Sequence, residues 1–261
     1  MFADSPTLVS TPARAAWAPP VHSGLPALAE WPTHAAQSLT RAGLRWLFRA
    51  AHITVAVEHT TALPPGPKIY ALNHPNMTDP LIVTQVVAEP LCGLMQADLF
   101  AVPALGWLLA RTGCLPVTRG GGSALLAAAS RKLAAGYTVA ICPEGRLNNG
   151  GPLAPGHTGA VRLALAAGVP LVPLGLYVRP EDVLDIHHFR YGRPARGRVQ
   201  VSGVCYATVG AAWWPAPAPA GVAPAEHLRH ATAELMQRLA TLTQQAAARC
   251  GAGAAQKGSL A

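Results

Sequence analysis

Charged side chains are scarce in this sequence, and their scarcity excludes a disordered chain. Asp, Glu, Lys and Arg make up 12% of the 261 residues, about half of the share that is usual in soluble domains. Hydrophobic residues make up 51%, whereas a disordered chain combines low hydrophobicity with high charge. A chain of this length can bury about 70% of its extended surface, which is enough for one sizeable core. So little charge also favours a surface that faces a membrane.

Long apolar runs, a secretory signal and paired cysteines are lacking too. The longest apolar stretch, residues 163–178, is broken by Gly168, Pro170 and Pro173, so we expect no membrane-spanning helix. The first residues show no basic region followed by an apolar run, so we expect no secretory signal. The five cysteines are odd in number and lack metal-ligand spacing, which predicts reduced thiols and no metal site. We therefore expect a cytoplasmic protein, peripheral on the cytoplasmic face of the membrane.

The charges that are present are mostly positive. Lys and Arg number 20 against 12 Asp and Glu, which gives a formal net charge of +8. Such an excess favours anionic partners such as phosphate esters, acidic lipids or nucleic acid. Aromatic residues make up only 6% and do not interleave with a basic stretch, so the stacking surface that single-stranded nucleic acid needs is missing. We expect no nucleic acid partner.

The pattern from residue 52 to residue 207 alternates between strands and helices. Alternation of this kind predicts an α/β fold, with a mostly parallel or mixed sheet covered by helices. An N-terminal amphipathic helix and a C-terminal helix flank it. We expect strands at residues 53–57, 68–72, 91–95, 114–117, 137–142, 171–178 and 199–206, and helices between them at 80–88, 103–111, 123–135 and 157–167.

Composition divides the chain into a central domain and its flanking segments. The predicted segments are an irregular N-terminal arm (1–32), an amphipathic helix (33–51), the central α/β domain (52–210), a Pro/Ala linker (211–224), a C-terminal helix (225–249) and a flexible tail (250–261). The linker is assigned from its repeated Pro and Ala.

The helix predicted at residues 33–51 has two possible environments. Apolar residues recur at helical spacing at positions 39, 43, 46, 47 and 50, and arginines recur at 41, 45 and 49. An arginine stripe beside Trp46 and Phe48 is typical of a helix that lies in a membrane interface. An ordinary surface helix with solvated arginines fits the same pattern.

The segment Asn73-His74-Pro75-Asn76-Met77-Thr78-Asp79-Pro80 carries the clearest chemical signal. Pro75 restricts His74 to extended backbone, so the strand ends there. Pro80 suits the first turn of a helix that has Asp79 at its N-cap. The tight turn between them can bring the Asp79 carboxylate to the His74 ring, where it would fix the tautomer of a general base. A capping Asp79 and a strand-ending His74 without chemistry are the alternative.

Two further segments place charge at the ends of apolar strands. Thr118-Arg119 ends one strand and runs into Gly120–Gly122, which suits a phosphate dianion. Pro143-Glu144-Gly145-Arg146 ends another, and ligands of α/β sheets sit at the carboxyl ends of strands. Taken singly, each segment also fits a surface role.

Four segments in order resemble the blocks of the glycerophospholipid acyltransferase family, whose best-known members acylate 1-acylglycerol-3-phosphate. The blocks are N-H-x-x-x-x-D at 73–79, G-x-x-P-V-x-R at 113–119, P-E-G at 143–145 and V-P-x-x-P at 169–173. Asp98-Leu99-Phe100 with Pro103, Gly106 and Trp107 is similar to the family's segment before its second block, and the resemblance spans about residues 52–178. It marks the central domain as an acyltransferase domain.

The resemblance implies a role for each matching residue. His74 would deprotonate an acceptor hydroxyl and Asp79 would orient it, and the alkoxide would attack an acyl thioester without an acyl-enzyme. Arg119 would hold the acceptor's phosphate, and Glu144 and Gly145 would shape the acceptor pocket. The substrate-binding residues predicted in this way are Asn73, Thr118, Arg119, Glu144, Gly145 and Arg146. The family needs no cofactor beyond acyl-CoA or acyl-ACP as co-substrate, and the implied partners are a lysophospholipid-like acceptor, a membrane surface at residues 33–51 and an acyl carrier protein.

Two departures from the family pattern concern the acceptor headgroup. Arg146 follows Gly145 directly, where the family has Thr or Gly before an Arg, and Gln96 stands where a Lys is common. A non-catalytic lipid-binding relative and an acyl thioesterase are therefore alternatives to a transferase. The arginines at 190, 193, 196 and 198 form either a patch for lipid headgroups or a carrier protein, or a solvated loop.

Overall fold

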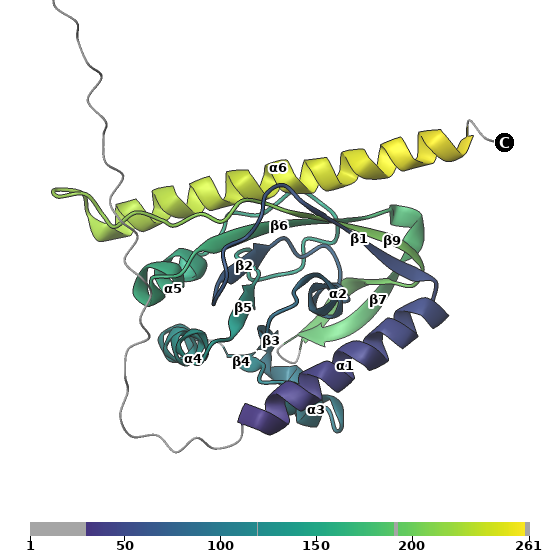
Figure 1. Ribbon diagram of the computed structural model, residues 1–261, viewed down its shortest axis with the longest axis horizontal. Helices are drawn as coiled ribbons and strands as arrows, with labels where there is room; N and C mark the ends of the chain where they lie inside the picture. The colour runs from purple at the N-terminus through teal and green to yellow at the C-terminus, as the bar shows by residue number, and fades with distance from the viewer. Residues whose placement is uncertain (1–29, 119, 191–192, 259–261) are drawn as a thin grey trace, which may run out of the picture.

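The computed structural model describes residues 30–118, 120–190 and 193–258, and it confirms the α/β fold. Most of the predicted N-terminal arm lies outside the described residues. Helices cover both faces of a seven-stranded mixed sheet (Figure 1). Its strands, in spatial order, are β1 (Ile53–His59), β9 (Gly203–Val209), β6 (Leu171–Val178), β2 (Ile69–Leu72), β5 (Thr138–Ile141), β3 (Leu91–Gln96) and β4 (Leu115–Val117).

Parallel pairing places the carboxyl ends of the central strands at one edge of the sheet. Strand β2 pairs in parallel with β5 and β6, and β3 pairs in parallel with β4 and β5. Strands β6 and β9 pair antiparallel, which makes the sheet mixed. All four residues of β2 are buried, because helices cover both faces. The segments that follow β2, β4 and β5 therefore meet at one edge.

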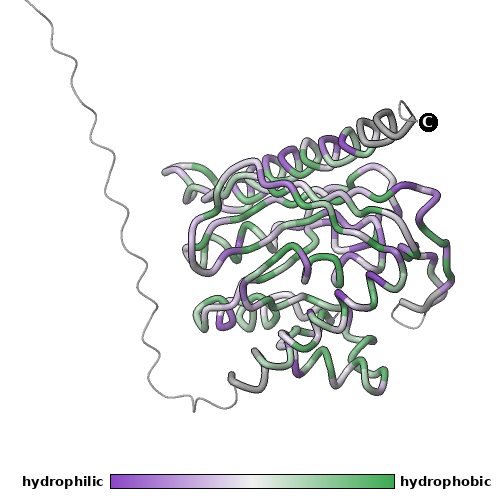
Figure 2. The backbone as a smooth tube through the Cα atoms, turned by 45° about the vertical axis from the view of Figure 1, so that its right-hand side comes forward, coloured by the Kyte–Doolittle hydropathy of each residue, from purple (hydrophilic) through white to green (hydrophobic). Residues whose placement is uncertain are grey.

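Two hydrophobic clusters fill the space between the sheet and the helices. One joins the sheet to α4 (Gly122–Ala134), α5 (Gly159–Ala167) and α6 (Pro224–Gly258). The other lies on the opposite face and includes Phe48 of α1 (Glu30–Ala50) with Ile82 and Val83 of α2 (Asp79–Val86). Figure 2 shows hydrophilic and hydrophobic colour alternating along α6. The short helices η1 (Ala97–Ala101) and α3 (Leu105–Arg111) follow β3.

Helix α6 packs directly on β6 at a glycine. A Cβ atom at Gly175 would lie 2.3 Å from the backbone carbon of Leu242 and 2.4 Å from the nitrogen of Thr243. Only glycine permits this close approach of helix and strand backbones. The helix also continues to Gly258, beyond the predicted end at residue 249, so part of the predicted flexible tail is helical.

The strand predicted at residues 199–206 is two strands, which is a correction. Strand β7 (Val183–Arg190) and strand β8 (Arg193–Gln200) form a separate antiparallel hairpin after the short helix η2 (Pro180–Asp182). The chain then turns at Gly203, whose φ is +75°, and enters β9. A Cβ at Gly203 would lie 2.2 Å from the Asp182 carboxylate, so glycine is needed at this turn.

Helix α1 exposes the face that carries its apolar residues. Leu39 is 75% exposed and Trp46 is 71% exposed. The opposite face packs on the domain through Phe48 and through Gln37, whose amide bonds both the N–H and the carbonyl of Leu91. Arg41 lies on that inner side and donates to the carbonyl of Ala88 at 2.6 Å. Of the predicted arginine stripe, Arg45 and Arg49 are exposed, whereas Arg41 is part-buried.

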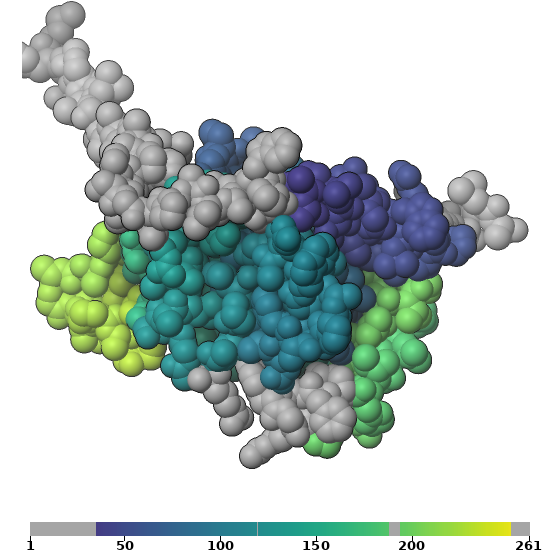
Figure 3. All heavy atoms as spheres, turned by 90° about the horizontal axis from the view of Figure 1, so that it is seen from below, coloured from purple at the N-terminus to yellow at the C-terminus, as the bar shows by residue number. Residues whose placement is uncertain are grey.

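Helices α1 and α3 contact each other, and both reach one face of the molecule (Figure 3). In the part of the chain that the structure describes, no helix is long and apolar enough to cross a membrane.

Candidate active site

The site begins where β2 ends. Asn73, directly after the strand, donates from Nδ2 to the carbonyl of Leu176 at 2.9 Å and accepts from its N–H at 2.7 Å. The side chain thus continues the pairing of β2 with β6 by one residue. Asn73 is 2% exposed, and its two bonds to Leu176 fix the start of the loop, while its role in substrate binding stays a prediction.

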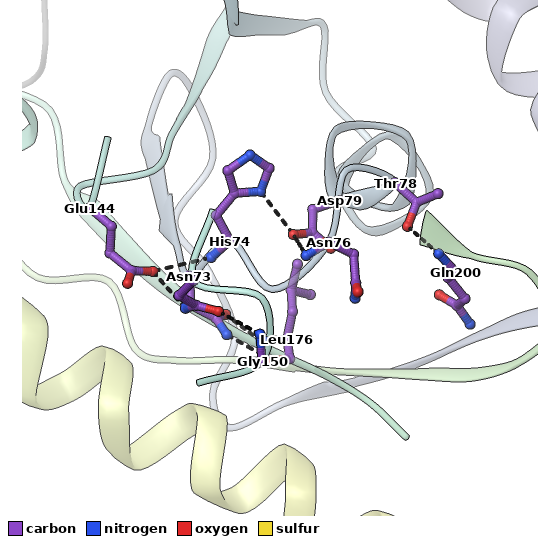
Figure 4. A network of polar contacts seen from close by, with 10 residues as sticks. Asn73, His74, Asn76, Thr78, Asp79, Glu144, Gly150, Leu176 and Gln200 are labelled. Atoms are coloured by element: carbon purple, nitrogen blue, oxygen red, sulfur yellow. Dashed lines mark hydrogen bonds and ion pairs between the residues drawn. The ribbon is translucent and has the colours of Figure 1, made fainter. Parts of the chain in front are cut away.

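His74 and Asp79 face each other across the loop, as Figure 4 shows. Nδ1 of His74 lies 2.9 Å from Oδ2 of Asp79. An ionised carboxylate only accepts hydrogen bonds, so this contact assigns the ring proton to Nδ1 and leaves Nε2 as the free base. The His74 side chain is 21% exposed and that of Asp79 is 1% exposed. The imidazole therefore reaches solvent while its carboxylate partner is held inside.

Asp79 is the first residue of α2 and not its N-cap, which corrects the expectation. The N-cap is Thr78, and Pro80 occupies the first turn as expected. Oδ2 of Asp79 also accepts the N–H of Asn76 at 2.8 Å. Burial raises the pKa of the Asp79 carboxyl, and the hydrogen bonds from His74 and Asn76 partly oppose this effect. The positive end of α2 favours the ionised form further.

Glu144 holds the backbone of the site together. Its Oε1 accepts the N–H of His74 at 3.3 Å and the amide of Asn148 at 2.9 Å. Its Oε2 accepts the N–H of Ala154 at 2.9 Å. The Glu144 side chain is 2% exposed and links two loops of the site, and its role in shaping the acceptor pocket stays a prediction.

The turn after Glu144 faces outward. Gly145 has φ of +61°, and a Cβ there would lie 2.9 Å from the ring of His157. Gly145 and Arg146 are both exposed beside the His74 loop. Thr118 is exposed at the end of β4, at the same edge of the sheet, and Arg119 lies outside the described residues. The exposed positions of these segments fit a polar site for the headgroup of the acceptor.

An apolar chamber lies next to the His74–Asp79 pair. Leu72, Asp79, Pro80, Ala140 and Cys142 are among its lining residues, so the chamber reaches the partner of His74. Helices α1, α2 and α3 and strand β3 form the rest of its wall, with leucines at positions 44, 81, 91, 94, 105, 108 and 109. Leu81 and Leu105 on this wall are also 36% and 38% exposed. An apolar lining of this kind suits an aliphatic chain.

The sequence pattern did not single out Asn148 or Cys142, which lie beside the His74–Asp79 pair. Asn148 donates its N–H to the carbonyl of His74 at 2.9 Å. The run Asn148-Asn149-Gly150-Gly151, rich in turn-forming residues, is the signal that could have indicated it. Cys142 lines the chamber, and burial, aided by the nearby charges of Asp79 and Glu144, raises the pKa of its thiol. Among the described residues, no group of three or more His, Cys, Asp or Glu side chains is arranged to hold a metal ion.

Comparison with known proteins identifies the family. The family model described as Acyltransferase matches residues 54–177, the region that contains the whole site. This match, together with the curated relatives below, supports the resemblance of residues 54–177 to the glycerophospholipid acyltransferases. The resemblance of the four sequence blocks is thereby confirmed.

Relatives of this acyltransferase domain include two bacterial enzymes. The chain is 33% identical over 153 residues to the lyso-ornithine lipid O-acyltransferase of Pseudomonas aeruginosa, covering 57% of each chain. It is 31% identical over 113 residues to the 1-acyl-sn-glycerol-3-phosphate acyltransferase of Salmonella typhimurium, covering 42% of this chain and 46% of the relative. The chain therefore spans about half the length of the curated relatives that it matches.

A solved structure shares the fold of the acyltransferase domain. The 1-acyl-sn-glycerophosphate acyltransferase of Thermotoga maritima superposes with a TM-score of 0.56 at 19% sequence identity, covering 82% of this chain and 79% of that chain. This likeness confirms the fold.

Proposed function

We propose that this protein is an O-acyltransferase that moves a fatty acyl group from an acyl thioester to the hydroxyl of a lysophospholipid-like acceptor. The observation that carries the proposal is the contact between His74 and Asp79 beside an apolar chamber. A hydroxyl of high pKa needs a base, and an aliphatic chain needs an apolar compartment. His74 supplies the base, and the chamber beside its loop supplies the apolar compartment.

The proposed reaction uses His74 first as a base and then as an acid. Nε2 removes the proton of the acceptor hydroxyl as its oxygen attacks the thioester carbonyl. Asp79 stabilises the imidazolium that forms, because its carboxylate lies against Nδ1. The tetrahedral intermediate then expels the thiolate, which takes the proton from Nε2. The products are the acylated lipid and the free thiol of coenzyme A or acyl carrier protein, and no acyl-enzyme forms.

The acceptor is proposed to be an anionic or zwitterionic lysolipid. The matched relatives are named for lyso-ornithine lipid and for 1-acyl-sn-glycerol-3-phosphate. Arg119 and the exposed Arg146 supply the positive charge that an anionic headgroup needs. Replacing Arg119 by Ala should raise the KM for the acceptor more than the KM for the thioester. The opposite pattern would place the headgroup elsewhere.

The protein is proposed to act at a membrane surface, with α1 as the main contact. Leu39 and Trp46 expose apolar area on α1, and Trp107 is 63% exposed on the neighbouring α3. Arg45 and Arg49 flank the apolar face of α1, as in helices that lie in an anionic interface. This arrangement would bring the chamber, whose wall includes exposed leucines, to the source of both lipids.

An acceptor panel tests the proposed function. The purified protein receives one acyl-CoA and, in separate reactions, lysophosphatidic acid, lyso-ornithine lipid or no acceptor. Mass spectrometry reads the acylated lipid, and thiol release is followed in parallel. Thiol release coupled to one acylated lipid supports a transferase. Equal release without acceptor would indicate a thioesterase, and no release with any lipid would favour a non-catalytic lipid-binding relative.

A further inference from the structure

The β7–β8 hairpin contacts both loops of the site, although it pairs with no strand of the main sheet. The carbonyl of Arg198 on β8 accepts the N–H of Met77 at 2.7 Å. The N–H of Gln200 lies 3.3 Å from Oγ1 of Thr78, which accepts it. On the other side, Nη1 of Arg198 donates to the carbonyl of Asn149 at 2.9 Å. Arg198 is thus a link between the His74 loop and the turn at residues 148–151.

The guanidinium of Arg198 packs closely against Gly150 in this turn. Gly150 has φ of +75°, and a Cβ there would lie 2.6 Å from Nη1 of Arg198. The Arg198 side chain is 20% exposed, whereas its ion-pair partner Asp185, with Oδ1 at 3.5 Å from Nε, is 83% exposed. A pair so open to solvent contributes little. The bond to Asn149 is therefore the contact that gives this side chain its position.

The turn that Arg198 holds is bonded to the catalytic residue itself. The N–H of Asn148 donates to the carbonyl of His74, and the amide of Asn148 donates to Glu144, which also accepts the N–H of His74. A displacement of the turn would move these donors away from His74. At the other end of the loop, Arg198 fixes Met77, next to the Asn76 N–H that bonds Asp79. One residue on the hairpin thus restrains both ends of the loop that carries the catalytic pair.

We propose that Arg198 is a positioning residue for acyl transfer, which keeps the His74 ring in contact with Asp79 by holding the turn at residues 148–151. The proposal rests on the proposed function. It assigns one of the four hairpin arginines to the site and not to a patch that binds lipid headgroups or a carrier protein. This role requires a hydrogen-bond donor that points at the carbonyl of Asn149, so the geometry of the Arg198 side chain matters more than its charge.

Kinetics of three variants test this role. Arg198→Met removes the donors, Arg198→Lys keeps the charge and a donor, and Arg196→Met removes an exposed arginine two positions earlier on the same strand. We expect Arg198→Met to lower kcat at least about tenfold, since small misplacements of a catalytic group cost up to about 10²-fold. The KM for acyl-CoA should stay unchanged. Arg198→Lys should recover part of the rate, and Arg196→Met should match the wild type.

A spectroscopic reading keeps this test separate from the proposed function. In protein labelled with ¹⁵N-histidine, the Nδ1–H proton of His74 is assigned by its loss in His74→Gln. We expect this signal to shift or broaden in Arg198→Met and to stay in place in Arg196→Met. An unchanged signal in Arg198→Met, or a raised KM for acyl-CoA in both methionine variants, would overturn the positioning role. Should the wild type acylate no lipid, the proposed function fails while the signal still decides the role of Arg198.

Discussion

At the residue scale, the site combines a base that reaches solvent with a carboxylate that is removed from it. Nδ1 of His74 contacts Asp79 at 2.9 Å, while Asp79 itself is 1% exposed. Removing a carboxylate from water is costly, and this cost is seen as a raised pKa of the Asp79 carboxyl. The contact that fixes the His74 ring therefore requires the unfavourable burial of the Asp79 carboxylate.

Replacing Asp79 by Asn should separate activity from stability. The amide keeps an oxygen for His74 and Asn76 but cannot balance an imidazolium, so we expect turnover to fall at least about 10²-fold. Because the folded pKa of Asp79 is raised, folding favours its protonated form. The free energy of unfolding therefore falls as pH rises from about 4, the pKa of an unfolded Asp.

The measurement is the melting temperature of both proteins against pH. The Tm of Asp79→Asn relative to the wild type should increase from acidic to neutral pH. A relative Tm that decreases over this interval would mean that the ionised carboxylate stabilises the fold, contrary to the account.

The residue scale also shows what the sequence could predict about the site. The two prolines around the His74 loop and the five-residue spacing predicted the contact between His74 and Asp79, and the other sequence blocks were needed to favour a chemical role for it. These signals did not predict the contacts of Asn73 and Glu144, whose partners Leu176 and His74 lie 103 and 70 positions away in the sequence. Their roles in substrate binding, implied by the resemblance, stay predictions, and a polar residue in a family block gives no sign that its bonds go to distant backbone.

At the element scale, the chamber depends on how α1, α2 and α3 surround β3. Gly93 of β3 lines the chamber. A Cβ at this position would lie 2.7 Å from the terminal methyl of Met95 and 3.6 Å from Sγ of Cys114. The methionine end can move, so the added methyl group fits at the expense of chamber space. The width of the chamber is therefore adjustable at one glycine.

Replacing Gly93 by Ala should shift the acyl preference toward shorter chains. The test is a competition between acyl-CoA donors of different length, with the acylated products measured by mass spectrometry. Gly43→Ala, on the exposed face of α1 with nothing within 4 Å of the new Cβ, serves as the control and should keep the wild-type profile. An unchanged profile in Gly93→Ala would place the acyl chain outside this chamber.

The crossing of α6 over β6 gives a second prediction at this scale. Gly175→Ala forces the backbones at Leu242 and Thr243 away from the strand, and overpacking of this kind costs about 1–3 kcal/mol. The Tm should fall by about 2–4 °C for each kcal/mol in a chain of this size. Gly43→Ala should not lower it. Equal melting temperatures for Gly175→Ala and the wild type would contradict the tight crossing.

Elements with a strong apolar pattern were predicted well, and polar ones were not. Strand β6, buried along nearly its whole length, begins and ends where predicted. The hairpin β7–β8 was missed because its strands pair only with each other. Such strands need no run of apolar residues, so the arginine-rich stretch resembled a loop. The sequence pattern also did not predict which face of α1 packs on the domain, because the polar residues Gln37 and Arg41 lie on that inner face.

At the scale of the whole molecule, the helices that line the chamber also carry exposed apolar side chains. Leu39 and Trp46 on α1, Leu81 on α2, and Leu105 and Trp107 on α3 are all at least 36% exposed. The helices that carry them also line the chamber. A shared surface of this kind fits a protein that takes its lipid substrates from a bilayer.

Charge introduced on this surface should weaken binding to membranes. Burying one large apolar side chain is worth about 1.5–3 kcal/mol, so we expect Trp46→Glu or Trp107→Glu to lower the partition into anionic vesicles at least about tenfold. Sedimentation with phosphatidylglycerol vesicles measures it. Trp214→Glu, 45% exposed in the linker before α6, is the matched control. An equal loss of vesicle binding in all three variants would show that this surface is not the membrane contact.

The most direct test of the central claim is the rate of acyl transfer from acyl-CoA to the best lysolipid by the wild type and by His74→Ala. We predict a loss of at least about 10²-fold in kcat, with the KM for acyl-CoA and the Tm unchanged. A variant that transfers acyl groups at close to the wild-type rate would show that another group removes the proton, and the proposed role of the His74–Asp79 pair would be wrong.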